Sequence, residues 1–127
     1  MTQDSIAQFA DAKYLSLETF RKSGVGVRTP VWFAQLPERA IFYVYSEANA
    51  GKVKRIRNNP KVRVAPCNFR GDLGGAWVDA RARICDAEEA SVCQQLLRRK
   101  YGWLKIAGDW FGRIMRHQNA MLAIELA

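Results

Sequence analysis

Residues 45–57 combine amino-acid types that bind anions. Tyr45 and Ser46 end a predicted strand, and a short helix follows with Gly51 and Lys52 near its start. Helix N-termini carry partial positive charge and usually attract Asp or Glu, so basic residues there fit best when an anion occupies the end. Glycine and lysine beside free backbone amides form a good phosphate site. A solvated basic face explains the same residues without a ligand. The segment lacks the P-loop glycine pattern, which argues against nucleotide hydrolysis.

Arg28 opens a second candidate region. It lies at the start of another predicted strand and is followed by Thr29, Pro30, Val31 and Trp32. A proline is tolerated in a strand only at a sheet edge or a bulge. We therefore expect this backbone to be partly free to meet a ligand. The arginines further along the chain fall on polar strand faces, where solvent is the default environment.

The overall charge favours an anionic partner. Lysine and arginine outnumber the acidic residues by 20 to 12, which gives a net charge of +8. Nucleic acid, an acidic membrane face and a phosphorylated small molecule all fit such a balance, and charge alone does not choose among them.

Cysteine and histidine offer little additional chemistry. Cys67, Cys85 and Cys93 are odd in number and lack the close spacing of a zinc or redox pair, so we expect buried free thiols. We expect no metal site. His117 is the only histidine. It could act as an acid or contact a cofactor, and a surface or structural role is the alternative.

The hydrophobic pattern is mostly of period two, as in half-buried strands. It predicts strands at residues 14–20, 27–36, 40–46, 62–69, 78–84 and 122–126. The connections between them are short and contain glycine or proline. Six strands with short turns fit a small antiparallel barrel, which makes the predicted fold mainly β.

Two helices interrupt the strands. One is predicted at residues 49–59, closed by Pro60, with Ser46 and Asn49 offering capping oxygens. Asp86 and Glu89 have the spacing of a capping box that opens a second helix. Its apolar side contains Ala90, Cys93, Leu97 and Tyr101, and it ends at Gly102.

The pattern of residues 103–117 is irregular, although a third helix is compatible with it. Trp103, Trp110 and Phe111 could line a substrate pocket, while packing in the core or at a dimer interface is the alternative.

The length of 127 residues predicts a single domain that spans residues 1–127. Such a chain can fold without disulfides or metal. The longest apolar runs, 31–36 and 40–44, are far shorter than the ~20 residues of a membrane span. The N-terminal segment carries acids where a secretory signal carries bases. We therefore expect a cytoplasmic protein without a membrane partner.

Three stretches of the chain resemble the pyridoxamine 5'-phosphate oxidase-like split-barrel superfamily. They are YSEANAGKVKRIRNNPKVRVAPCNF, VRTPVW before it and AWVDARARI after it. The most specific feature is a strand end with Ser46, then Lys52 after five residues, then a helix ending in Asn-Asn-Pro. The chain looks most like the small members that bind FMN or the deazaflavin coenzyme F-420. The resemblance implies a six-stranded split barrel that forms a homodimer with the cofactor between subunits.

The resemblance also assigns site residues by matching position. Arg28 and its neighbours Thr29, Pro30, Val31 and Trp32 would flank the ring system and ribityl chain of the cofactor. Tyr45, Ser46 and Lys52 would hold its phosphate. Departures from the oxidase itself are Gly51, where that enzyme has a second base, and the turn Gly74-Gly75 in place of a glutamine. They argue against oxidation of pyridoxine phosphate.

Three functional hypotheses follow. The first is an oxidoreductase that uses FMN or coenzyme F-420 for hydride transfer with a small organic substrate. No residue stands out as a general acid or nucleophile, so the cofactor would carry the reaction. The second is a protein that binds a flavin, a deazaflavin or a tetrapyrrole without turnover. The third is a basic barrel that binds nucleic acid, because aromatic residues interleaved with arginines suit single strands.

Overall fold

The computed structural model describes residues 6–36, 40–47, 50–101 and 119–126. Within these residues the chain forms six strands and two helices of at least eight residues. The elements, in chain order, are β1 (Tyr14–Phe20), β2 (Gly26–Leu36), β3 (Ile41–Glu47), α2 (Gly51–Asn58), β4 (Lys61–Cys67), β5 (Val78–Ile84), α3 (Ala87–Tyr101) and β6 (Asn119–Leu126).

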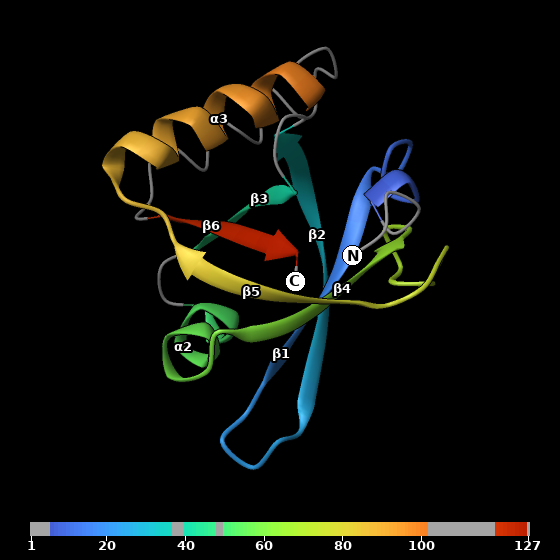
Figure 1. The fold of residues 1–127 in the computed structure, drawn as a ribbon, viewed down its shortest axis with the longest axis vertical. Helices are drawn as coiled ribbons and strands as arrows, with labels where there is room; N and C mark the ends of the chain where they lie inside the picture. The colour runs from blue at the N-terminus through green and yellow to red at the C-terminus, as the bar shows by residue number, and fades with distance from the viewer. Residues whose placement is uncertain (1–5, 37–39, 48–49, 102–118, 127) are drawn as a thin grey trace.

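The strands form a closed antiparallel barrel in the order β1-β2-β3-β6-β5-β4 (Figure 1). The predicted fold class is confirmed, and every predicted strand is present with its ends shifted by three residues or fewer. The longest extension is that of β6, which begins at Asn119.

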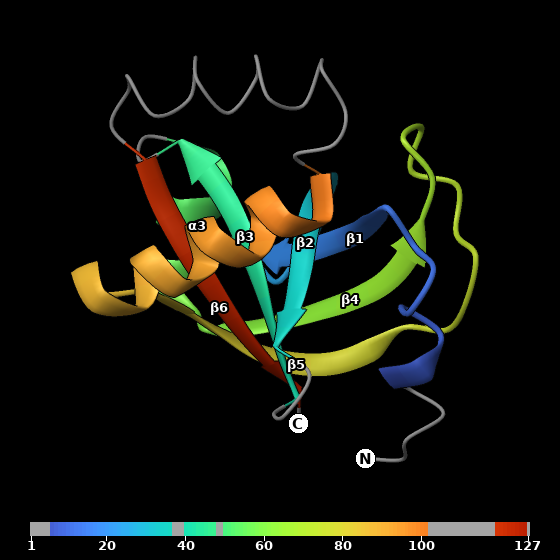
Figure 2. The same cartoon turned by 90° about the horizontal axis from the view of Figure 1, so that it is seen from above.

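Alternation along each strand separates an interior face from an outer face. The interior is filled by the barrel's own side chains, including Leu17, Phe33 and Leu122. Phe9 of the N-terminal segment and Val53 of α2 join the same core. Figures 1 and 2 show this segment and α2 on opposite sides of the barrel. The interior is therefore packed like a core and closed at both ends.

Helix α3 packs on the outer face of the barrel. Figure 2 shows it crossing β6, β3 and β2. Cys93 and Leu97 of α3 are fully buried against Tyr43, Met121 and other side chains of that face. Cys93 and Leu97 belong to the apolar side that the sequence predicts for this helix, and that side contacts the sheet.

No helix in the described part of the chain is long and apolar enough to cross a membrane. The segment 103–117, with the predictions made for Trp103, Trp110, Phe111 and His117, lies outside the described residues.

Candidate functional site

The candidate site lies where β2 and β3 part. Residues 26–32 of β2 pair with β1, but only residues 33–36 pair with β3. The last pair before the strands separate is Phe33 with Val44. Beyond it, β3 continues beside β6 through Glu47. Continued pairing would have placed Trp32 opposite Tyr45, so these two residues, which the resemblance assigns to a cofactor site, lie on the two sides of the parting.

Pro30 lies in the half of β2 that has β1 as its partner strand and does not pair with β3. A proline removes one backbone donor from the ladder and is found mainly at sheet edges. The sequence-based expectation of a partly free backbone at this proline is therefore met.

The start of α2 carries the residues on which the predicted anion site rests. The first turn contains Gly51 and Lys52 and no acidic residue. The N-cap residue is Ala50, whose side chain gives no capping hydrogen bond. Ser46 was expected to offer a capping oxygen, but it lies buried in β3 and is not the N-cap. Asn49, the other expected cap, lies outside the described residues.

Arg55 brings a further cation to the start of α2. Its Nε donates a hydrogen bond to Oγ1 of Thr19 in β1, at 2.6 Å. A Cβ built on Gly51 would lie 2.8 Å from Nη1 of Arg55, so the glycine leaves space for this guanidinium. Sequence reasoning could not find this role, because the contact joins residues 36 positions apart. The only hint was the general density of basic residues in the helix.

Arg28 lies in a row of charged residues on the outer face. Its Nε donates to Glu18 of β1 at 3.0 Å, and Arg63 of β4 donates to the same carboxylate at 2.6 Å. Both guanidinium groups lie over the ring of Trp77, at 4.8 and 5.0 Å from its centroid. Glu18 is 4% exposed, whereas the Arg28 side chain is 55% exposed. Arg28 is thus oriented by a buried partner while it still reaches solvent.

The hydrogen bond from Arg63, more than that from Arg28, lowers the pKa of Glu18, while burial opposes the shift. Glu18 is therefore ionised at neutral pH and fixes two cations beside Trp77. Sequence reasoning missed Glu18, because an acidic residue in a half-polar strand is ordinarily a solvent-facing one.

The predicted site residues do not all face the same way. Side chains alternate along a strand, so Tyr45 and Ser46 point to opposite faces. Tyr45 packs on the outer face with α3, and Ser46 is buried opposite Ala120 of the interior core. In β2, Val31 belongs to the interior core, and Thr29 shares its face by the same alternation. Arg28, Pro30 and Trp32 lie on the outer face.

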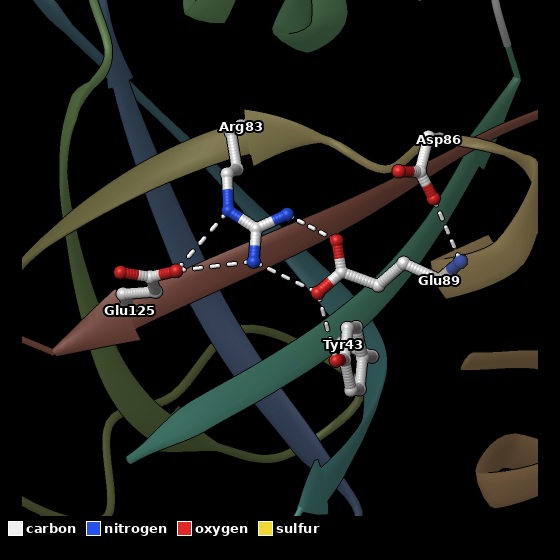
Figure 3. A network of polar contacts seen from close by, with 5 residues as sticks. All are labelled: Tyr43, Arg83, Asp86, Glu89 and Glu125. Carbon is white, nitrogen blue, oxygen red and sulfur yellow. Dashed lines mark hydrogen bonds and ion pairs between the residues drawn. The ribbon is translucent and has the colours of Figure 1, made fainter. Parts of the chain in front are cut away.

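A polar network holds α3 beside the site (Figure 3). Glu89 of α3 accepts hydrogen bonds from Arg83 of β5 and from the hydroxyl of Tyr43 of β3, the latter at 2.9 Å. Arg83 also contacts Glu125 of β6 at 3.0 Å. Burial and then Glu89 raise the pKa of Tyr43 to about 12, so this phenol remains a proton donor to the carboxylate.

The three cysteines are free, as the sequence predicts. Cys67 and Cys93 are buried and Cys85 is half-buried. Burial raises the pKa of all three thiols, that of Cys85 to about 12. Thiolates are the reactive form of cysteine, so these residues are poor nucleophiles at neutral pH.

Comparison with known proteins identifies no matching family model and no curated protein of similar sequence. Solved structures do match. The heme storage protein HutZ from Vibrio cholerae is 14% identical with a TM-score of 0.70, over 98% of this chain and 89% of that one. An FAD-binding protein from Mesorhizobium loti is 16% identical with a TM-score of 0.67, over 100% and 90%.

A candidate pyridoxamine 5'-phosphate oxidase from Listeria innocua is also similar. It is 16% identical with a TM-score of 0.63, over 98% of this chain and 91% of that one. At these identities the similarity concerns the fold.

Proposed function

Since this chain has the split-barrel fold of the pyridoxamine 5'-phosphate oxidase-like superfamily, we propose that it binds a flavin-type cofactor and uses it for hydride transfer with a small organic substrate. FMN and the deazaflavin coenzyme F-420 are the two candidates. The observation that carries the proposal is the start of α2. Gly51, Lys52 and the guanidinium of Arg55 gather positive charge at the start of α2, the helix that follows β3 in the chain.

The phosphate site can supply only part of the binding free energy. A charge-assisted hydrogen bond contributes about 1.5–3 kcal/mol. Micromolar affinity requires about 8 kcal/mol. Burial of the ring system must therefore provide most of the remainder. The barrel interior is filled by its own side chains. The ring would consequently lie outside it, and we propose that a second copy of the chain covers it.

Each residue then has a role that follows from its position. Lys52 and Arg55 bind the phosphate, and Arg28 orients the ring from a position fixed by Glu18. Trp32 packs at the parting of the strands and excludes water there. When bound, the cofactor supplies the hydride chemistry, while the protein orients both reactants.

A second candidate function is binding without turnover, of a flavin or a tetrapyrrole. One observation favours it: HutZ, a protein of the same fold, is a heme storage protein. Reduction of the bound cofactor by a hydride donor, and its reoxidation by an added electron acceptor, would distinguish the enzyme from the carrier.

The proposal is tested by titrating the purified protein with FMN, coenzyme F-420 and heme. We expect micromolar binding of one of the two flavin-type cofactors. Lys52→Ala should weaken that binding ten- to a hundredfold, which corresponds to one charged contact. Lys54→Ala is the matched control, because Lys54 is an exposed lysine of the same helix. It should leave the affinity within about twofold.

Two results would contradict the proposal. If neither FMN nor coenzyme F-420 binds, the proposed function is wrong. If the wild type and Lys52→Ala bind the cofactor with equal affinity, Lys52 at the start of α2 does not bind the phosphate. Tight binding of heme alone would favour the carrier.

A further inference from the structure

Lys100 makes an unusual contact for a residue of a surface helix. It lies near the C-terminal end of α3, which crosses the outer face of β2 (Figure 2). Its Nζ lies 3.4 Å from the ring centroid of Phe33. Phe33 belongs to the interior core, where it packs on Phe9 and Phe42. A cation carried by a helix outside the barrel therefore contacts a ring inside it.

The parting of β2 and β3 explains how the ammonium reaches this ring. Hydrogen-bonded strands lie about 4.8 Å apart and form a continuous wall that a side chain does not cross. Phe33 and Val44 form the last pair before the two strands separate. The Lys100 ammonium thus lies on the Phe33 ring beside the parting. Trp32 and Tyr45, two residues predicted to contact a cofactor, pack in the same outer cluster as α3.

An ammonium in this position has a cost. Burial of a charge is unfavourable, and it lowers the pKa of Lys100 to about 8. The face of Phe33 compensates for part of the lost hydration through a cation–π contact. The outer cluster below α3 also contains titratable side chains, namely Tyr43, Tyr45 and Cys93, and Cys85 packs against it. Arg98 and Arg99, the charged neighbours on α3, are exposed.

We propose that Lys100 is a ligand-binding residue of the cofactor site, whose ammonium donates a hydrogen bond and a positive charge to the carbonyl-bearing edge of the flavin-type ring. The inference rests on the proposed function and adds a residue that neither the sequence resemblance nor the α2 site assigned. In this arrangement α2 binds the phosphate from the β3 side of the parting. Lys100 approaches the ring from the β2 side.

This role makes ligand affinity depend on pH in a defined direction. The ammonium is mostly present at pH 7 and mostly lost at pH 9, since its pKa is about 8. Between these values the affinity for FMN should fall about fivefold, as the charged donor becomes a neutral amine. Arginine remains charged throughout this range. Lys100→Arg should therefore bind FMN with an affinity that does not change with pH.

The experiment measures the dissociation constant of FMN by fluorescence quenching from pH 7 to pH 9. The proteins are the wild type, Lys100→Arg, Lys100→Met and Arg99→Met. Methionine preserves the apolar stem, and thermal unfolding verifies that each variant is folded. Lys100→Met should bind about tenfold more weakly than the wild type at pH 7, with no pH dependence. Its bound FMN should also be harder to reduce. Arg99→Met, the control on the same helix, should behave as the wild type.

The outcomes separate this inference from the proposed function. If Lys100→Met matches the wild type in affinity and in pH profile, the role of Lys100 is wrong and the proposed function stands. If the wild type binds coenzyme F-420 in place of FMN, the same comparison is made with that ligand. If it binds neither, both the proposed function and the role of Lys100 are overturned.

Discussion

At the scale of single residues, Glu18 orients the two guanidinium groups that lie over Trp77. Its carboxylate accepts from Arg28 and Arg63, and both guanidiniums lie over Trp77. A Cβ built on Gly26 would lie 2.6 Å from Oε2 of Glu18, so this glycine leaves the space in which the carboxylate lies. Arg28 is consequently a pre-oriented cation, and less ordering is required when a ligand binds.

Replacement of Glu18 should lower stability in a pH-dependent way. Glu18→Gln removes the charge that two guanidiniums share. Loss of one partner of a buried ion pair costs about 3–5 kcal/mol. Both arginines remain partly hydrated, with side chains 55% and 36% exposed. We therefore expect a smaller loss of unfolding free energy at pH 7, about 1–3 kcal/mol, measured by urea denaturation.

The sign of the pH effect follows from the lowered pKa of Glu18, due first to Arg63. A carboxyl whose folded pKa is depressed stabilises the protein above its ordinary pKa of 4.5, and this stabilisation disappears as pH falls through the folded value. The difference between wild type and Glu18→Gln should therefore shrink in acid. Asp79→Asn removes an exposed carboxyl that pairs in register with Arg63, and its effect should stay within about 0.5 kcal/mol. A loss equally large for both variants would contradict this account.

At the scale of elements, the position of α3 depends on Glu89. The spacing of Asp86 and Glu89 predicts a capping box. Oδ1 of Asp86 does accept a hydrogen bond from the backbone N–H of Glu89 at 2.8 Å, so the cap is present. The Glu89 side chain instead contacts Arg83 and Tyr43, which belong to two strands of the barrel. A local signal thus located the start of the helix but not the contacts that attach it to the sheet.

Glu89→Ala should loosen α3 while the barrel stays folded. The substitution leaves the buried hydroxyl of Tyr43 without its acceptor and removes an anion from beside Arg83. A loss of about 1.5–2 kcal/mol would raise the population of the open helix about ten- to thirtyfold. Hydrogen exchange of α3 amides should accelerate by that factor, while amides of β1 and β4 keep their protection.

Glu88→Ala is the control, because Glu88 is exposed in the same first turn. It should change the exchange of α3 by less than about threefold. In wild-type protein the protection factors of the α3 amides, which are corrected for the pH dependence of intrinsic exchange, should fall by a similar factor in acid. Arg83 is the main cause of the lowered pKa of Glu89, and the stabilisation is lost as pH falls below the ordinary value of 4.5 and through the lowered one. Exchange that is uniform along the chain would contradict the local role.

The strands could be predicted from the sequence, because the alternation of apolar and polar residues is a local property. Ala80 and Ala82 are buried and Arg81 between them is exposed, as the alternation predicts. The parting of β2 and β3 could not be derived in this way, since it depends on how distant strands pair with one another. Pro30 gave the one local hint. The contacts of Arg55 with Thr19 and of Arg63 with Glu18 join residues 36 and 45 positions apart, and no spacing rule reports them.

At the scale of the whole molecule, the side chains of the described residues fill the barrel, so we place a tricyclic ring outside it. Its core is continuous from Phe9 at one end to Val53 of α2 at the other. A ring bound at the parting of β2 and β3 would keep one side exposed in a single copy. In the proposed dimer a second copy would supply the missing burial, but each chain carries a net charge of +8 and would repel the other. An anionic cofactor reduces this repulsion.

Cofactor binding and dimer formation should therefore be linked. A ligand that stabilises the dimer must bind more tightly to the dimer, by the same factor. Sedimentation measured at low micromolar protein should show a larger dimer fraction with saturating FMN than without it. The apparent affinity for FMN should weaken on dilution into the nanomolar range. Lys52→Ala, examined at saturating FMN, should still dimerise, because it lowers affinity without removing the ring. The account is contradicted if the FMN-bound protein sediments as a monomer and its affinity for FMN does not depend on protein concentration. In that case a single copy binds the ring.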